Sequence, residues 1–295
     1  MANEGNRPEA SVNAVVYATD FSICSENAGN YARLLAVHFS ATLLVAHAFH
    51  LTQAAMEVEA GHRAMSKQRE DLQKLLTQRA DALSSESLKA VPFLLEGSLQ
   101  EAIPALAEKH APSLIVLGTH GAGRFKHEII GSMAEKILRS TRRPCLTVGP
   151  HAPQSAAADP PFRRILYATD FSPSAAHAAV FALTFAHLEG GDIDVLNVIP
   201  ENAAGEPGRL AELEERYRHA LDELVPQQTG EFCSPHTFVK TGKAHDRIMG
   251  HIRENNIDLL VLGIRKSSHL GLEMRTSGAF RLIADAPCPV LTITG

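Results

Sequence analysis

The chain repeats itself, and this constrains its fold more than any other feature. The hexapeptide Tyr17-Ala-Thr-Asp20-Phe-Ser22 recurs unchanged as Tyr167-Ala-Thr-Asp170-Phe-Ser172. In each half an aliphatic run then ends in Val-Leu-Gly, at Gly118 and at Gly263, and a Pro-Cys step precedes a last apolar run. Three shared landmarks in one order predict two copies of a single domain, at residues 1–150 and 162–295. The Pro- and Ala-rich stretch 151–161 is typical of a linker.

Each half alternates short apolar runs with amphipathic segments. In the first half this pattern predicts strands at 14–18, 43–46, 91–95, 114–117 and 145–148, and helices at 25–38, 64–83, 98–109 and 132–140. We expect Ser98 and Ser132 to cap the last two helices, and Pro92 favours an edge position for its strand. Residues 51–63 fit either an irregular lid or the start of the long helix. The alternation predicts an α/β fold with two repeated open parallel sheets covered by helices on both faces.

Composition excludes several classes of protein. The chain is 21% charged and 45% hydrophobic, which is typical of a globular protein. It has no run of about 18 apolar residues, and its polar first 13 residues lack the apolar core of a secretory signal. A net charge of −5 does not favour a nucleic-acid surface. The four cysteines are widely spaced, which favours buried thiols over a zinc site or disulfide framework. We therefore expect a cytoplasmic protein with neither a membrane nor a nucleic-acid partner.

The candidate site lies where apolar runs end, because open parallel sheets bind ligands beyond the carboxyl ends of their strands. Asp20 follows the first predicted strand, Gly118-Thr-His-Gly121 follows the fourth, and Gly131-Ser132 opens a helix nine residues later. Glycines let backbone amides approach a phosphate, and a helix N-terminus offers unpaired N–H groups. This pattern predicts a polyphosphate cradle, with Asp20 accepting hydrogen bonds from a sugar or a base. A Walker-type loop, a dinucleotide fingerprint and a nucleophile elbow are all absent from the sequence.

The spacing of the glycines resembles the ATP-binding signature of the universal stress protein family: Gly118-x-x-Gly121 is followed, after nine residues, by Gly131-Ser132. The segments Ala-Thr-Asp-Phe-Ser and Gly-Ser-Met-Ala-Glu-Lys-Ile-Leu also resemble that family. The resemblance implies a five-stranded parallel sheet per domain in the order 3-2-1-4-5. It also implies pairing of two domains through their last strands, here within one chain, and leaves a further homodimer open. The residues that it assigns to the nucleotide are Ala18, Asp20, Ala48, Gly118, Gly121, Gly131, Ser132 and Met133.

The second half departs from this signature. Asp170 and Gly263 remain, but Lys266 stands at the second glycine position and Thr276-Ser277 replaces the Gly-Ser pair. A Cβ at these positions restricts the backbone and crowds a phosphate. A second site would use Asp170, Val198, Gly263 and Ser277. We favour instead a degenerate domain that is retained for pairing.

A phosphate cradle without a catalytic constellation favours a regulatory protein that binds ATP, ADP or AMP, with or without Mg²⁺. The alternative is a slow ATP hydrolase or nucleotide-dependent phosphotransferase, with Asp20 or Asp170 as a Mg²⁺ ligand. A third hypothesis is an interaction module without a ligand. Turnover that Asp20→Ala abolishes would favour the enzyme. We interpret His47 and His50 as exposed histidines at a strand end rather than as metal ligands.

Overall fold

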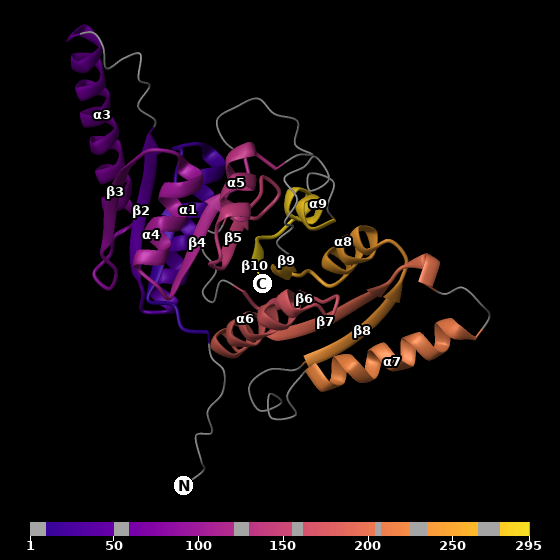
Figure 1. Ribbon diagram of the computed structural model, residues 1–295. Helices are drawn as coiled ribbons and strands as arrows, with labels where there is room; N and C mark the ends of the chain where they lie inside the picture. Colours follow the sequence, from indigo (N-terminus) through magenta and orange to yellow (C-terminus); the bar gives the residue numbers. More distant parts are fainter. Residues whose placement is uncertain are drawn as a thin grey trace. The chain divides into compact units, whose positions relative to one another are not determined.

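The computed structural model describes residues 10–49, 59–120, 130–154, 162–203, 208–224, 235–264 and 278–294. The chain divides into two units, which we call the N-terminal unit (residues 12–157) and the C-terminal unit (residues 158–295 together with residues 1–11). Figure 1 shows that each unit is a sheet flanked by helices. Among the described residues, no helix combines the length and the apolar character that crossing a membrane requires.

The five apolar runs of the N-terminal unit form one parallel sheet. Its strands are β1 (Ala14–Ala18), β2 (Thr42–Phe49), β3 (Ala90–Glu96), β4 (Ser113–Gly118) and β5 (Cys145–Val148). Its helices are α1 (Ile23–His38), α3 (Glu59–Leu83), α4 (Leu99–Lys109) and α5 (Ser132–Ser140). The strand order is β3-β2-β1-β4-β5, which confirms the predicted order. Pro92 lies in the edge strand β3, as expected.

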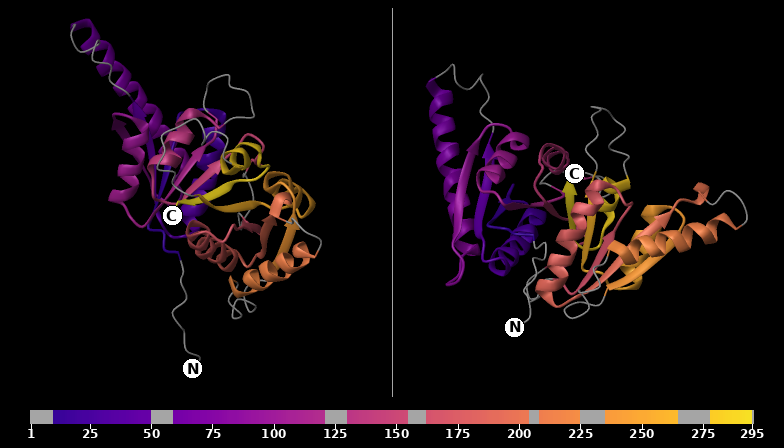
Figure 2. Two further views of the ribbon diagram at one scale, coloured as in Figure 1. Left: turned by 45° about the vertical axis from the view of Figure 1, so that its right-hand side comes forward. Right: turned by 60° about the horizontal axis from the view of Figure 1, so that its bottom comes forward.

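Helices cover both faces of this sheet. Helix α1 packs on β1, β4 and β5 and α3 packs on β2 and β3, whereas α4 and α5 pack together over the other face. Residues of both faces are therefore buried, so that Val15, Val16 and Tyr17 are each 0% exposed. This burial explains why the sequence shows continuous apolar runs instead of alternation. Helix α3 extends beyond the end of the sheet (Figures 1 and 2).

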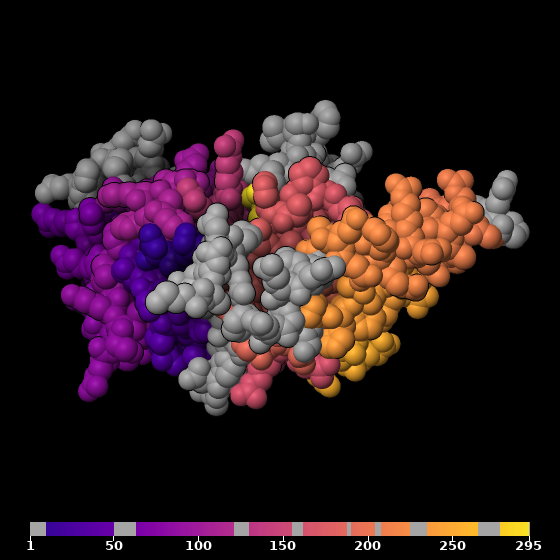
Figure 3. Space-filling view, turned by 90° about the horizontal axis from the view of Figure 1, so that it is seen from below, coloured from indigo at the N-terminus to yellow at the C-terminus, as the bar shows by residue number. Residues whose placement is uncertain are grey.

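The C-terminal unit repeats the same plan. Its strands are β6 (Arg164–Ala168), β7 (Asp192–Ile199), β8 (Pro235–Thr241), β9 (Leu259–Ile264) and β10 (Val290–Thr294), in the order β8-β7-β6-β9-β10. Its helices are α6 (Pro173–Glu189), α7 (Arg209–Leu224), α8 (Ala244–Glu254) and α9 (Gly278–Asp285), with a short 3₁₀ turn, η1, at Glu201–Ala203. Figure 3 shows α7, in orange, at the surface of this unit. The polar face of that helix is exposed at Glu212, Glu215, Arg216 and Arg218.

Local details differ from the sequence-based expectations at three helix starts. Ser132 is the first residue of α5, and its N-cap is Gly131. The predicted cap at Ser132 was therefore wrong by one residue, because the Gly131 N–H bonds to the Thr119 carbonyl at 2.7 Å. Ser98 is the N-cap of α4, but its hydroxyl makes no capping bond. Helix α3 already includes residues 59–63, which favours the start of a long helix for that stretch, while residues 50–58 lie outside the described residues.

Two of the described cysteines, Cys145 and Cys288, behave as buried apolar residues. Cys145 opens β5 and Cys288 lies two residues before β10, each 1% exposed. Burial raises the pKa of the Cys145 thiol, and burial together with the Asp258 carboxylate raises that of Cys288 to about 12. Neither thiol is therefore ionised near neutral pH. Cys233 lies outside the described residues.

Candidate functional site

The turn between β1 and α1 fixes the Asp20 carboxylate. Ser22 caps α1 and donates from both its N–H and its Oγ to Asp20 Oδ1, at 3.1 and 2.6 Å. The intervening Phe21 has a φ of 60°, which a non-glycine residue rarely adopts. Asp20 is exposed, and its second carboxylate oxygen has no partner among the described residues. The turn thus holds a carboxylate at the end of β1 with one oxygen that no described residue contacts.

A hydrogen-bond network beneath this turn joins it to α1. The Thr19 and Ser25 hydroxyls lie 2.7 Å apart, and the Tyr17 hydroxyl donates to the Ser25 carbonyl at 2.7 Å. The Phe21 N–H bonds to Thr19 Oγ1 at 3.0 Å. Because Thr19 and Ser25 are both 3% exposed, these bonds satisfy polar groups that have lost water. The position of Asp20 is therefore set by the buried frame below it.

The end of β4 meets the start of α5 at Gly131. A Cβ on Gly131 would lie 2.8 Å from the Thr119 carbonyl oxygen, so that only glycine fits at this N-cap without a shift. Among the described residues, no side chain makes a capping hydrogen bond to the first turn of α5. The N–H groups of that turn remain available to an anion, which the helix dipole also favours.

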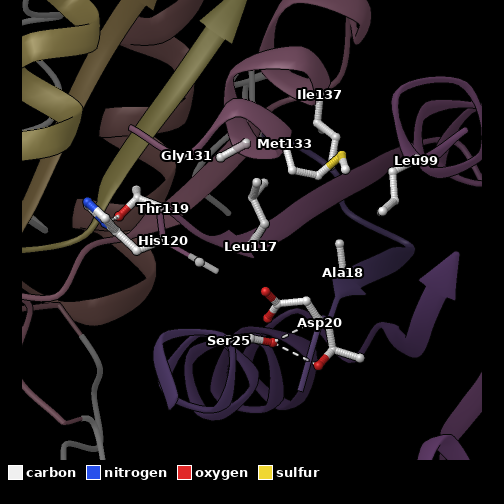
Figure 4. Close-up of a pocket in the computed structure, with 13 residues that line it drawn as sticks. Ala18, Asp20, Ser25, Leu99, Leu117, Thr119, His120, Gly131, Met133 and Ile137 are labelled. Atoms are coloured by element: carbon white, nitrogen blue, oxygen red, sulfur yellow. Dashed lines mark hydrogen bonds between the residues drawn. The ribbon is translucent and has the colours of Figure 1, made fainter. Parts of the chain in front are cut away.

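These elements enclose a pocket of about 70 Å³ (Figure 4). Figure 4 shows Asp20 and Ser25 on one side of it and Met133 and Ile137 of α5 on the other. The pocket is lined by Ala18, Thr19, Asp20, Ser25, Leu99, Leu117, Gly118, Thr119, His120, Gly131, Met133, Ala134 and Ile137. Its walls are mostly apolar, and polar groups gather at the ends of β1 and β4, an arrangement that suits a flat ring carrying a polar tail.

Gly118 also has a structural role. A Cβ on Gly118 would lie 3.0 Å from the carbonyl carbon of Cys24 and 3.1 Å from the Ser25 nitrogen. Helix α1 therefore crosses the end of β4 in close contact, and glycine permits this approach. The first glycine of the motif is required for packing whatever the pocket binds.

The carboxylate gives the mouth of the pocket a negative charge. Partial burial raises the pKa of the Cys24 thiol, and the nearby Asp20 carboxylate raises it further. Cys24 is only partly buried. It is nevertheless not an activated thiol, because the groups around it favour its protonated form.

The structure brings five of the eight N-terminal candidate residues to this pocket: Ala18, Asp20, Gly118, Gly131 and Met133. Ala48 is buried in β2 and Ser132 is exposed at the start of α5, and neither lines the pocket. Gly121 lies outside the described residues.

Sequence reasoning included Thr119 and His120 only as part of the glycine motif, and it did not assign several other wall residues to the site, among them Leu99, Leu117, Ala134 and Ile137. Leu99 opens α4, which follows β3 at the same edge of the sheet as Asp20. The rule that ligands bind at the carboxyl edge would have pointed to this helix start. Ala134 and Ile137 follow from helical spacing after Met133.

The C-terminal unit has a pocket at the equivalent position. It measures about 210 Å³ and includes Asp170, Val198 and Gly263 of the second candidate site, while Ser277, Lys266 and Thr276 lie outside the described residues. The Asp170 turn copies the first one, because Ser172 N–H bonds to Asp170 Oδ1 at 3.0 Å and Phe171 has a φ of 58°. Burial, with a smaller contribution from Asp170, raises the pKa of Tyr167 beneath it.

The described residues contain no group of three or more His, Cys, Asp or Glu that could hold a metal ion. His47 is partly buried, and its Nδ1 lies 2.7 Å from the Thr19 carbonyl oxygen. Asn197 takes its place in the second half and donates to the Thr169 carbonyl at 2.9 Å. Both side chains therefore hold the turn that follows the first strand of their unit. His50 lies outside the described residues.

Comparisons with known proteins agree with this architecture. The model of the universal stress protein family matches residues 12–149 and 161–294. A universal stress protein of Synechocystis sp. is 38% identical over 65 residues, which cover 22% of this chain and only 23% of that protein. One from Methanocaldococcus jannaschii is 21% identical over 150 residues, which cover 45% of this chain and 93% of the relative.

Solved structures give the same result for the fold. A universal stress protein from Archaeoglobus fulgidus superposes with a TM-score of 0.71 at 22% identity, covering 96% of this chain and 98% of that chain. One from Pseudomonas aeruginosa gives a TM-score of 0.59 at 16% identity, covering 97% and 94%. Both structures share the fold of this chain. The two matches of the family model show in addition that the chain belongs to the universal stress protein family and carries its domain twice.

Proposed function

We propose that the N-terminal pocket binds an adenine nucleotide and that the protein acts as a nucleotide-dependent regulator in a stress response. One observation carries this proposal. An apolar pocket is bordered both by the Asp20 carboxylate, one oxygen of which has no partner among the described residues, and by the first turn of α5, which no described side chain caps. Such a pair of features suits a ligand with hydroxyl groups at one end and anionic groups at the other.

Different residues of the pocket would contact different parts of the nucleotide. Asp20 would accept a hydrogen bond from a ribose hydroxyl or from the amino group of the base. Leu99, Leu117 and Ile137 would contact the faces of the ring. The first N–H groups of α5 would receive the phosphates, where the helix dipole favours negative charge, and Gly131 would leave room for them because it has no side chain. The resemblance of the glycine spacing to an ATP-binding signature supports this assignment.

The first test is the nucleotide content of the purified protein. After denaturation without added ligand, released ATP, ADP and AMP are quantified per mole of chain. We expect about one ATP per chain from a regulatory site in the N-terminal unit. Steady conversion of added ATP to ADP would instead support the hydrolase hypothesis. A protein that is empty and does not take up ATP would contradict nucleotide binding.

A matched pair of variants tests the role of Asp20. Asn keeps the oxygen that accepts from Ser22, so that Asp20→Asn preserves the turn but removes the negative charge. Since a hydrogen bond to a charged group contributes about 1.5–3 kcal/mol, we expect ATP affinity to fall roughly tenfold or more. Asp170→Asn makes the same change in the other unit and serves as the control. Titration calorimetry measures both, and equal losses in the two variants would contradict a predominantly N-terminal site.

A further inference from the structure

The backbone hydrogen bonds between β1 and β2 end one rung earlier than the strand geometry allows. The Ala46 carbonyl accepts from the Thr19 N–H at 2.9 Å, so the backbone of Ala46 faces β1. Ala48 follows two residues later in the same strand, and its N–H and C=O therefore face the same side. The next rung would join the Ala48 N–H to the Thr19 carbonyl. That bond is missing from the described part of the chain.

The His47 side chain takes the place of the missing donor. Its Nδ1 lies 2.7 Å from the Thr19 carbonyl oxygen, and since a carbonyl only accepts, this nitrogen carries the proton. The N–H of Ala48 is left without a partner among the described residues, although Ala48 is only 6% exposed. A buried backbone N–H without a protein partner is rare, so this group is expected to donate to water or to a ligand.

The C-terminal unit repeats this arrangement with a different side chain. The Thr169 N–H bonds to the Leu196 carbonyl at 2.9 Å, and the next rung, from Val198 to Thr169, is again absent from the bonds of the described residues. Asn197 Nδ2 donates to the Thr169 carbonyl at 2.9 Å instead. Val198 lines the pocket of this unit, which we call the second pocket. The residue with the displaced N–H therefore borders a cavity.

The hydrogen-bond donor is the feature that the two side chains share. The His47 ring also contacts the Phe21 ring, with centroids 4.8 Å apart, whereas Phe171 stacks on Tyr217 of α7, at 5.5 Å and 17°. Asn197 is 6% exposed, and its Oδ1 has no partner among the described residues. Because burying an unsatisfied amide oxygen is costly, the bond from Nδ2 to the carbonyl best explains why an asparagine stands there.

From these observations we propose that His47 and Asn197 are positioning residues of the two candidate sites. Each side chain occupies the last carbonyl of the first strand of its unit and thereby keeps the N–H of the next residue, Ala48 or Val198, available to a ligand. The strand fixes the direction of this N–H beside the aspartate turn. A ring nitrogen or a sugar oxygen of the ligand would complete the missing hydrogen bond. This inference rests on the proposed function insofar as the ligand is an adenine nucleotide.

The variant His47→Leu tests the backbone arrangement without any ligand. Leucine cannot donate, so the Ala48 N–H is expected to bond to the Thr19 carbonyl and to extend the ladder by one rung. Hydrogen exchange of the Ala48 amide, followed by NMR in the nucleotide-free full chain, should then be about three- to tenfold slower than in the wild type, the effect of one hydrogen bond. The variant His47→Asn keeps a donor, as Asn197 does, and should exchange like the wild type.

Titration calorimetry with ATP tests whether the free N–H is used. We expect His47→Leu to lower ATP affinity about three- to tenfold and His47→Asn to restore it. Chemical denaturation of both variants should give midpoints close to that of the wild type, because the Thr19 carbonyl keeps a donor in each. A merely structural role of His47 would instead lower stability and affinity together, and asparagine would not restore the affinity.

The variant Asn197→Leu makes the same change in the C-terminal unit. It should slow hydrogen exchange of the Val198 amide by a similar factor. This second measurement decides the backbone arrangement if His47→Leu does not fold.

The outcomes separate this inference from the proposed function. If the Ala48 amide exchanges equally fast in the wild type and in His47→Leu, His47 does not keep the N–H free and the inference is overturned. If exchange changes as expected but ATP affinity does not, the N–H is not part of the nucleotide site and the positioning role is wrong. If no adenine nucleotide binds to the wild type while exchange changes as expected, the proposed function fails, whereas the control of the backbone N–H by His47 stands.

Discussion

Replacing Asp194 with leucine is expected to destabilise the C-terminal unit by about 3–5 kcal/mol, as removal of one partner from a buried ionisable pair generally does. Asp194 Oδ2 lies 2.7 Å from Nε2 of His251 in α8, and the two side chains are 8% and 1% exposed. His236 in β8 approaches Asp194 Oδ1 at 3.5 Å, and Phe238 packs edge-on against the His251 ring. Asp194→Leu leaves His251 buried without its hydrogen-bond acceptor.

The N-terminal unit supplies the control for this prediction. In the sheet registers Leu44 lies beside Val91 where Asp194 lies beside His236, and Leu106 is the eighth residue of α4 as His251 is of α8. The first repeat thus fills the same space with three apolar side chains. The variant Asp194→Leu/His251→Leu/His236→Val should therefore be as stable as the wild type or more stable, because well-packed apolar residues often replace a buried polar cluster without loss.

Chemical denaturation monitored by circular dichroism measures both variants. The two results together test the cause of the effect. If the triple variant is as unstable as Asp194→Leu alone, the cluster contributes through its hydrogen bonds and not merely as a desolvated pair. A wild-type-like Asp194→Leu protein would show that His251 finds another acceptor or water.

The fold was predictable to a large extent because buried parallel strands produce continuous apolar runs. All five strands of the N-terminal unit overlap their predicted ranges. Because the sequence landmarks recur in the same order, the same fold was predicted for the second half. Helix starts were less predictable, as at Ser132, where the backbone bond from Gly131 to Thr119 decides the cap. Such a contact joins residues 12 positions apart and leaves no periodic signal in the sequence.

The candidate site was predictable at its polar positions and much less so at its apolar walls. Asp20 and Gly131 stand in recognisable motifs, whereas Leu99 and Ile137 are indistinguishable in sequence from other core residues. Whether an apolar residue faces a pocket or the interior depends on how two helices approach one sheet edge. The same holds for the Asp194–His251 pair, since 57 residues separate its members and sequence alone does not bring them together.

Gly263→Ala is expected to be among the most destabilising single substitutions in the chain. An added Cβ would lie 2.3 Å from the Ala175 nitrogen and 2.4 Å from the Ser174 carbonyl carbon, which are backbone atoms of α6. The helix would have to move away from β9, and we expect a loss of about 3 kcal/mol or more, at the upper end for overpacked cores. Gly118→Ala should lose less, because its Cβ would stand 3.0 Å from the backbone of Cys24.

Gly278→Ala is the matched control, since its Cβ would meet nothing within 4 Å and Ala loses less entropy in a helix than Gly. We expect a gain of about 0.4–1 kcal/mol from this change. Unfolding free energies should therefore rank Gly278→Ala above the wild type, followed by Gly118→Ala and then Gly263→Ala. If Gly263→Ala instead keeps full stability, helix α6 does not pack on β9 as closely as the structure shows. In that case the glycine at position 263 would be required for binding a ligand and not for packing. The result would favour nucleotide binding in the second pocket, which is the role that the glycine motif implies.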